Sequence, residues 1–201
     1  MIIAIDGPSA SGKGTLGRAL AHKLGYHYLD TGALYRMVGL SVQRRGLDPT
    51  DQESAAAIAA SLDPSSFQDS ELRGEGVGSY ASKIAALPKV RAALLKLQRD
   101  FAQKKPGTVL DGRDIGTVVC PDADFKFFVT ASVEARAGRR LREHPTSDLA
   151  AITADIKARD ERDSNRAVAP LKPAEDSILI DNSELTPDEA LQAVLGAIEL
   201  Y

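Results

Sequence analysis

Nine residues, 7–15 (GPSASGKGT), constrain the fold of this chain more than any other part of its sequence. They follow a short apolar run, 2–6, and precede a segment with helical periodicity, 16–24. Glycines in a turn between a strand and a helix let backbone N–H groups point inward around phosphate oxygens, and the helix N-terminus favours the same anion. A strand, the pattern G-x-x-x-x-G-K and a helix together predict a P-loop rather than an ordinary Gly/Ser turn.

Lys13 and the residues after it carry most of the chemistry of this loop. The lysine can reach the outer phosphates of a nucleotide, and a nearby hydroxyl is needed to coordinate Mg²⁺. The simple pattern has Ser or Thr directly after the lysine, whereas this chain has Gly14 there and Thr15 one residue later. The residues predicted to bind phosphate are Gly7, Pro8, Ser9, Ala10, Ser11, Gly12, Lys13, Gly14 and Thr15.

Apolar runs and helical patterns alternate along the rest of the chain, which predicts an α/β fold with a five-stranded parallel sheet and helices on both faces. The predicted strands are 2–6, 27–29, 108–110, 125–129 and 178–180. The predicted helices are 16–24, 33–45, 52–62, 81–104 with a break at Pro88, 133–143, 149–165 and 187–199. Two irregular segments, about 63–81 and about 143–170, are expected at the carboxyl ends of the strands, where ligands bind. The chain is interpreted as one domain, 1–201.

The composition disfavours several classes of protein. A net charge of −3 and a low aromatic content, with no Trp, argue against binding to nucleic acid. No apolar stretch approaches the length of a membrane span, and residues 1–5 are too short for a signal peptide. The single Cys120 allows no internal disulfide and is expected in the core, and the three histidines lack metal-ligand spacing. We therefore expect a soluble cytoplasmic protein without a membrane or nucleic-acid partner.

The segment DTGALYR, residues 30–36, follows the second predicted strand. Thr31 is predicted to cap a helix, which places Tyr35 and Arg36 one turn along it, near the carboxyl end of that strand. Arginine suits such a place because its planar guanidinium binds phosphate oxygens in pairs. A surface Tyr–Arg pair would explain the segment equally well when it is taken alone.

The segment VLDGRDIGT, residues 109–117, contains the third predicted strand and the loop after it. Asp111 ends the strand at the position from which P-loop proteins contact Mg²⁺ or its water. Arg113 and Asp114 follow in the loop. A plain Asp-Gly turn is the alternative interpretation of this segment.

A charged helix near the carboxyl end carries Arg159, Arg162, Asp163 and Arg166. The spacing i, i+3, i+4 and i+7 places all four on one helix face. Three positive charges and one carboxylate there predict an anion site with an acceptor for a hydroxyl group, such as that of a ribose. A solvated salt-bridge ladder would produce the same pattern.

Five segments together resemble the bacterial-type cytidylate kinase family of nucleoside monophosphate kinases. They are GPSASGKGT, DTGALYR, PKVRAALL, DGRDIGTVV and RDERDSNRAVAPLKPA, in the family's order between residues 7 and 174. The resemblance implies a P-loop NTPase-like fold with a short NMP-binding insert and a short lid. It also implies a monomer that transfers the γ-phosphate of ATP to CMP or dCMP with Mg²⁺. The insert is shorter than in long members of the family, which puts strict rejection of UMP in doubt.

The same resemblance implies roles for the candidate site residues. Residues 7–15 hold the phosphates of ATP, with Arg136 or Arg139 as a further ATP contact. The implied acceptor contacts are Arg36, Arg113 and Arg166 for the phosphate, Ser82, Arg91 and Asp114 for cytosine, and Tyr35, Arg159 and Asp163 near the sugar, with Thr31 completing the set. The expected catalytic residues are Lys13, Arg113, Arg159 and Arg166. The expected Mg²⁺ ligands are Thr15 and Asp111, directly or through water.

The chemistry of cytosine fits these residue types. Asp114 accepts from the amino group, while Arg91 and Ser82 donate to the ring nitrogen and the carbonyl. Uracil would present a carbonyl to Asp114, and a buried unpaired polar group costs about 1–3 kcal/mol, or roughly 10- to 1000-fold in selectivity. Two alternatives stay open: another small P-loop kinase (of adenylate, dephospho-coenzyme A or UMP/CMP type) and a nucleotide-binding module without catalytic activity.

Overall fold

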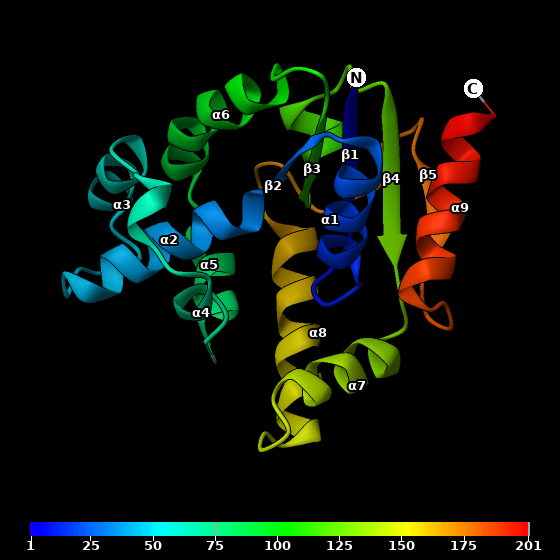
Figure 1. The fold of residues 1–201 in the computed structure, drawn as a ribbon. Coiled ribbons are helices and arrows are strands. Elements are labelled where there is room, and N and C mark those ends of the chain that lie inside the picture. Colours follow the sequence, from blue (N-terminus) through cyan, green and yellow to red (C-terminus); the bar gives the residue numbers. More distant parts are fainter. Residues whose placement is uncertain (75, 201) are drawn as a thin grey trace.

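The computed structural model describes residues 1–74 and 76–200. Within them the chain forms five strands: β1 (Ile2–Asp6), β2 (His27–Asp30), β3 (Thr108–Gly112), β4 (Phe125–Thr130) and β5 (Ile178–Asp181). All neighbouring strands pair in parallel, in the order β2-β3-β1-β4-β5. The predicted five-stranded parallel sheet is therefore confirmed, and the carboxyl ends of its strands lie at one edge (Figure 1).

The segments between the strands are mostly helical, because parallel strands need long crossover connections. They are α1 (Lys13–Leu24), α2 (Thr31–Arg44), α3 (Gln52–Ala60), the 3₁₀ turn η1 (Pro64–Ser66), α4 (Asp69–Leu72), α5 (Val77–Ile84), α6 (Pro88–Ala102), the π-helical turn η2 (Ile115–Val119), α7 (Val133–Glu143), α8 (Leu149–Asn165) and α9 (Pro187–Glu199). The predicted break at Pro88 is confirmed: the proline occupies the first turn of α6, where its missing N–H has no helical partner to lose. The segment 63–81 contains short helices and no strand among its described residues, from which Glu75 is missing.

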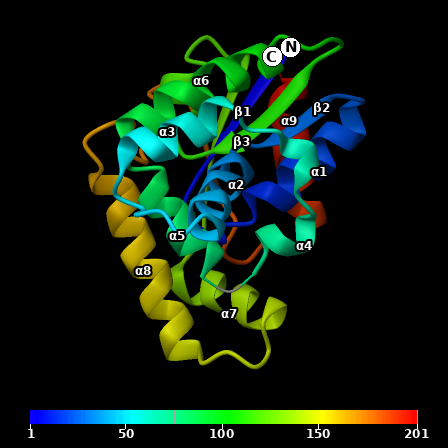
Figure 2. The ribbon, with the colours of Figure 1, turned by 90° about the vertical axis from the view of Figure 1, so that its left-hand side faces the viewer.

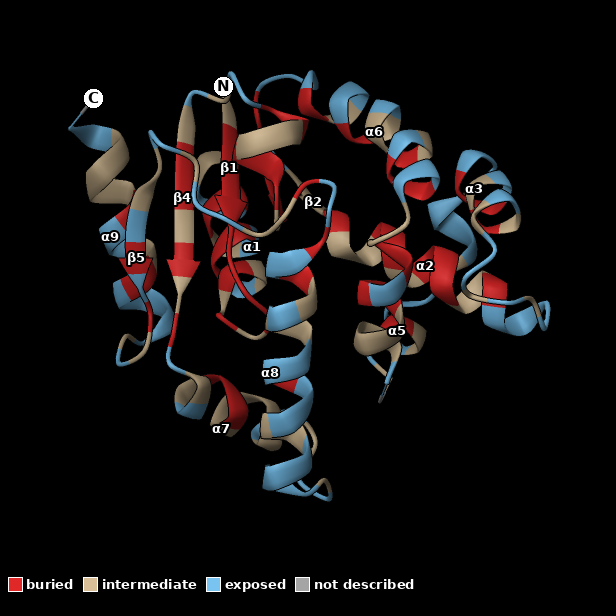
Figure 3. Ribbon diagram, turned by 180° about the vertical axis from the view of Figure 1, so that it is seen from behind, coloured by how far each residue is buried: buried red, intermediate tan, exposed pale blue. Residues whose placement is uncertain are grey.

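Apolar side chains alternate along the strands and cover both faces of the sheet. On one face, Ile3 and Ile5 of β1 pack against α1 and α9. On the other face, Ala4 and Leu110 pack with Cys120, below α6 and η2. This division follows from the period of two along a strand, and it confirms the core position predicted for Cys120. Figure 3 shows the buried stretches along β1 and β4 in red.

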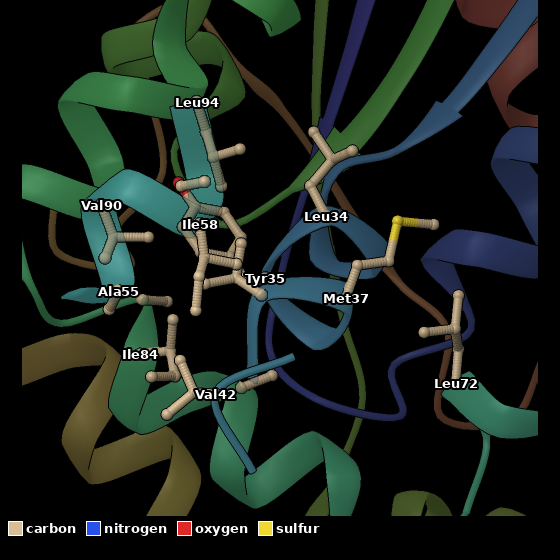
Figure 4. Packing of buried hydrophobic residues seen from close by; sticks show 14 residues of the cluster. Leu34, Tyr35, Met37, Val42, Ala55, Ile58, Leu72, Ile84, Val90 and Leu94 are labelled. Carbon is tan, nitrogen blue, oxygen red and sulfur yellow. The ribbon is translucent and has the colours of Figure 1, made fainter. Parts of the chain in front are cut away.

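A second apolar core lies beside the sheet and holds the helices α2, α3, α5 and α6 together (Figure 4). Leu34 and Val42 of α2 meet Ile58 of α3, Ile84 of α5 and Leu94 of α6, and each of these side chains is less than 5% exposed. The helices of this core carry several of the candidate acceptor residues. Their positions therefore depend on packing between helices rather than on the sheet.

Helices α7 and α8 form a pair beyond the carboxyl ends of the strands (Figures 1 and 2). An ion pair of 2.6 Å between Arg136 and Asp160 links them, with the arginine side chain only 5% exposed. The expectation that Arg166 lies on the face of α8 is wrong, because the helix ends at Asn165 and the backbone of Arg166 is extended. At that end the N–H of Leu171 donates to the carbonyl of Asp163 at 2.8 Å, so the chain turns away from the helix axis.

Candidate active site

A cavity of about 1350 Å³ lies at the carboxyl ends of the strands, between α1, α2, α5, α7 and α8. Eleven Lys and Arg residues line it against seven Asp and Glu, although the whole chain has a net charge of −3. Such a concentration of positive charge in one concave region indicates a site for polyanions. The predicted acceptor residues that line it are Thr31, Tyr35, Arg36, Ser82, Arg91, Arg113, Asp114, Arg159, Asp163 and Arg166.

The loop 7–15 lies at one side of this cavity, in a conformation that requires glycine at two positions. A Cβ on Gly7 would lie 2.0 Å from the carbonyl oxygen of Val129. Gly12 has a φ of 92°, and a Cβ there would lie 2.4 Å from Nδ2 of Asn182. Helix α1 begins directly afterwards, so its N-terminus faces the loop. The strand, loop and helix therefore have the arrangement of a P-loop.

Lys13 is buried at the base of the loop. Its side chain is 8% exposed, and Nζ donates to the carbonyl oxygen of Pro8 at 3.2 Å. Burial and then the positive charge of Arg113 lower the pKa of this amine to about 7. Phosphate oxygens in the cavity would favour the charged amine and raise that pKa. The charge on Lys13 thus depends on the anion beside it.

Asp111 presents a buried carboxylate to the cavity from the end of β3. The Tyr28 hydroxyl donates to its Oδ2. Burial and then the charge of Asp30 raise the pKa of Asp111 to about 6, while Lys13 opposes them. A divalent cation near this carboxylate would favour its ionised form.

The oxygen donors near the P-loop fit an Mg²⁺ ion that arrives with a nucleotide. Thr15 and Asp111 both line the cavity. Mg²⁺ commonly takes one or two protein oxygens and completes its octahedron with water and substrate phosphates. Within residues 1–74 and 76–200, no group of three His, Cys, Asp or Glu side chains is placed to hold a metal. The donor set therefore suits a nucleotide-borne ion better than a resident metal.

Asp30, and not Thr31, caps α2. The carboxylate of Asp30 accepts from the N–H of Ala33 at 3.0 Å and pairs with Arg36 at 2.6 Å. The predicted cap, Thr31, instead donates its hydroxyl to the carbonyl of Asp111 at 2.7 Å. The prediction failed because the neighbouring strand β3 supplies an acceptor that local sequence does not show. Thr31 therefore joins α2 to β3 at the edge of the cavity.

The acceptor side of the cavity contains arginine nitrogens without a hydrogen-bond partner. They are Nε of Arg36, Nε of Arg159 and Nη2 of Arg166, all buried. Burial and then the charge of Arg113 lower the pKa of Arg159 to about 10. Leaving buried donors unpaired costs free energy. The arrangement therefore favours a ligand that brings several anionic oxygens.

Asp163 of α8 connects segments that are far apart in sequence. Its Oδ1 accepts from the Ser82 hydroxyl at 2.7 Å, and its Oδ2 accepts from Nε of Arg113 at 2.9 Å. Although burial acts to raise it, Arg113 and the Ser82 bond hold the pKa of Asp163 below its usual value. Gly78 permits the same approach of α8 to α5, since a Cβ there would lie 2.8 Å from Nη1 of Arg159.

Asp114 lies in the most enclosed part of the acceptor side, at 4% exposure. Its Oδ2 accepts from Arg91, and its Oδ1 lies 3.5 Å from Nη2 of Arg166. Arg91 also donates to the carbonyl of Ala85 at 3.2 Å and lies over the ring of Tyr35. Two of the three residues predicted to read the base, Arg91 and Asp114, therefore meet in a buried pocket, where a mismatched group would lack water as a partner.

The two arginines of α7 differ in position. Arg139 lines the cavity, and its Nη1 donates to the carbonyl of Ser11 at 3.2 Å. Arg136 does not line it; its side chain is buried and donates to the carbonyl of Ser9 at 3.1 Å. Arg139 is therefore the candidate ATP contact, and Arg136 joins α7 to the P-loop.

Several polar residues near the site were missed by sequence reasoning. They are Asp6, Tyr28, Asp30 and Asn182. Asp6 and Asp30 end β1 and β2, and Asn182 directly follows β5. A polar residue at the carboxyl end of a parallel strand is the signal that could have found these three, because ligands bind at that edge.

The P-loop, the parallel sheet and the arginine-lined cavity define this chain as a P-loop kinase. Solved structures agree at the level of fold. An uncharacterized protein from Eubacterium ventriosum matches with a TM-score of 0.62 and 15% identity, over 100% of this chain and 99% of its own. A gluconokinase from Sinorhizobium meliloti matches with a TM-score of 0.53 and 15% identity, over 98% of this chain and 91% of its own.

Comparison of sequences is more specific. The family model for cytidylate kinase matches residues 3–200. A cytidylate kinase from Paramagnetospirillum magneticum is 55% identical over 204 residues, which cover 98% of this chain and 97% of the relative. The chain therefore belongs to the cytidylate kinase family, and the resemblance seen in its motifs is confirmed.

Proposed function

We propose that this chain transfers the γ-phosphate of ATP to CMP and dCMP, with the residues described above in the roles that its motifs suggest. One observation carries the assignment of roles: the P-loop with Lys13 and the buried pair of Asp114 and Arg91 line the same cavity. Arginines with an unpaired buried nitrogen line that cavity too. A nucleoside monophosphate presents phosphate to the arginines and its base to the buried pair. The donor phosphates bind at the P-loop.

Catalysis in this arrangement is positioning and charge neutralisation. The acceptor phosphate is already a nucleophile, so no strong base is required. Lys13, Arg113, Arg159 and Arg166 neutralise the charge that spreads over the transferring group. The Thr15 hydroxyl and the Asp111 carboxylate would hold Mg²⁺, which would supply positive charge to neutralise the donor phosphates.

Selection of cytosine follows from the hydrogen-bonding character of the buried groups. Asp114 accepts from the exocyclic amino group, and Arg91 and Ser82 donate to the ring nitrogen and carbonyl. The carboxylates proposed for the base and the sugar already have protein donors: Arg91 donates to Asp114, and Ser82 donates to Asp163. When CMP binds, donor groups of the substrate can take the place of these protein donors, so each carboxylate still accepts hydrogen bonds. UMP would instead place a carbonyl against the Asp114 carboxylate, so that two acceptors would face each other.

The proposal also divides the chain into working parts. Residues 63–81 form part of the acceptor-binding insert, with Ser82 directly after them, and residues 143–170, with α8, form a lid whose closure excludes water. A monomeric state and a cytoplasmic location stay predictions from the resemblance. Across the part of the chain that the structure describes, no helix combines the length and apolar character needed to cross a bilayer.

An acceptor panel tests this function. ADP release from Mg·ATP is measured with CMP, dCMP, UMP, AMP and GMP for the wild type, Arg166→Ala, Asp114→Ala and, as a control, Arg45→Ala, an exposed arginine outside the cavity. We expect CMP and dCMP to lead, with Arg166→Ala reduced about 1000-fold or more and Arg45→Ala unchanged. Asp114→Ala should mainly lose selectivity. A lead by UMP or AMP would contradict the base pocket, and ATP binding without acceptor-dependent ADP release would indicate a module without catalysis.

A further inference from the structure

The last residue of β1, Asp6, has a buried carboxylate that does not line the cavity. Its Oδ1 accepts from the N–H of Ile115 and its Oδ2 from the N–H of Gly116, both at 2.8 Å. These are the first two N–H groups of η2, the π-helical turn that directly follows Arg113 and Asp114. Single π-helical turns occur often at functional sites.

Asp114 occupies the N-cap position of η2 but does not cap it. An aspartate at an N-cap usually accepts from the N–H groups of the first turn. Here the side chain of Asp114 makes no such bond and instead pairs with Arg91 and Arg166 in the cavity. Because the turn is buried, its free N–H groups still need acceptors. Asp6 supplies them from the neighbouring strand.

The carboxylate of Asp6 has little other reason to be in this place. No ion pair with Lys, Arg or His involves Asp6 within residues 1–74 and 76–200, where its hydrogen bonds come from the two N–H groups of η2. Burying a carboxylate without a cation is unfavourable, and burial raises the pKa of Asp6 to about 7. An apolar residue would fill the same space without that cost. The two bonds to η2 are therefore the feature that the carboxylate provides.

We propose that Asp6 is a positioning residue for acceptor selectivity: it caps η2 from β1 and so leaves the carboxylate of Asp114 free to read the base. The same two bonds join the strand that leads into the P-loop to the turn that follows Arg113. One side chain thus fixes the donor loop and the acceptor-reading turn relative to each other. This inference rests on the role proposed for Asp114.

Asp6→Asn tests it with a side chain of the same shape. One carboxylate oxygen becomes an NH₂ group, so one N–H of η2 faces a donor. Asp114, the N-cap residue, is of the type that accepts from such N–H groups and becomes a competing acceptor. We expect the ratio of kcat/KM for CMP to kcat/KM for UMP to fall about tenfold, with KM for ATP changed less than twofold. The matched control is Asp124→Asn at the opposite end of β1, whose carboxylate accepts from the N–H of Ile2 at 2.6 Å, outside the cavity. Its ratio should stay at the wild-type value.

A double-mutant cycle separates this inference from the proposed function. If Asp6 acts through Asp114, the double variant of Asp6→Asn and Asp114→Asn has the same CMP/UMP ratio as Asp114→Asn alone. Equal losses for CMP and UMP in Asp6→Asn would overturn the inference and leave a structural role. If Asp114→Asn itself kept the wild-type ratio, the proposed base reading would fail and this inference with it. Asp6→Ser, which keeps one oxygen acceptor, is measured alongside. The thermal stability of each variant is also measured, so that a folding defect in one variant does not decide the outcome.

Discussion

The donor and acceptor halves of the cavity are built in different ways. The donor half is nine consecutive residues, 7–15, which connect β1 to α1 and include the first three residues of that helix, on the apolar core of the sheet. The acceptor half draws on α2, α5, α6, α8 and the end of β3, and rests largely on the separate helical core (Figure 4). A continuous loop keeps its geometry through covalent connection and strand pairing, whereas the acceptor half must be assembled from separate elements.

Ion pairs between side chains do much of that assembly. Arg36 with Asp30, Arg91 with Asp114, and Arg113 with Asp163 each join a predicted substrate contact to a carboxylate. Removing one member of a buried pair leaves the other charge without compensation. Substitutions in the acceptor half should therefore act on neighbours as well as on the ligand, and substitutions in the donor half should act more locally.

The largest effect in the donor half is expected from Lys13→Ala. Loss of a preorganised cation at the transferring phosphoryl group should lower kcat about 100- to 1000-fold, while the affinity for CMP stays near the wild-type value. Steady-state kinetics and CMP binding by calorimetry measure the two quantities. Lys23→Ala, at the exposed end of the same helix, is the control. A large fall in CMP affinity would show that the two halves are not independent.

The next effect is expected in the acceptor half, from Arg36→Ala. Hydrogen bonds to charged groups contribute about 1.5–3 kcal/mol, so KM for CMP should rise roughly 10- to 100-fold and KM for ATP only slightly. Arg44→Ala on the same helix removes an exposed pair with Glu71 and should change little. Titration of each nucleotide at saturating levels of the other makes the measurement. Equal rises in both KM values would contradict the division between the halves.

The affinity of the donor half for ATP should change by about tenfold per pH unit. The pKa of Lys13 is lowered to about 7, and bound phosphate raises it. Above pH 7 the free amine is mostly neutral, so ATP binding must take up a proton and affinity should fall as the pH rises. Calorimetry at pH 8.5 in two buffers of different ionisation enthalpy should detect an uptake approaching one proton per ATP. Lys13→Ala should lose this uptake, and a wild type without it would contradict the interpretation.

The smallest effect on activity is expected from substitutions in the two apolar cores. Leu94→Ala in the helical core and Leu20→Ala in the sheet core each remove a side chain with 0% exposure. Each should cost about 2–5 kcal/mol and lower the melting temperature by roughly 5–15 °C. Leu94→Ala should raise KM for CMP a few-fold, because Arg91 lies one turn away on α6, and Leu20→Ala should instead raise KM for ATP. The same change of KM in both variants would argue against separate supports for the two sites.

The sequence predicted features that depend on neighbours along the chain. The parallel sheet, the P-loop and the break at Pro88 each follow from local spacing and residue type. Membership of the cytidylate kinase family could also be recognised from short motifs. The capping role of Thr31 and the helical position of Arg166 were predicted wrongly by the same local rules. For Thr31, the neighbouring strand β3 supplied the acceptor. At Arg166, the chain left the helix axis, and the N–H of Leu171 bonds to the carbonyl of Asp163.

The partners of the charged side chains were decided by tertiary structure alone. Nothing near Asp163 in the sequence indicates that it would accept from Ser82, which lies 81 positions earlier. Likewise Asp6 bonds to backbone N–H groups more than 100 positions away, and so frees Asp114 from capping its own turn. The sequence by itself determined which charged groups this protein has, because composition and local pattern are written in it. Which charges neutralise each other depends on how the two cores pack, since electrostatic and hydrogen-bond energies act over distances in space and not along the chain.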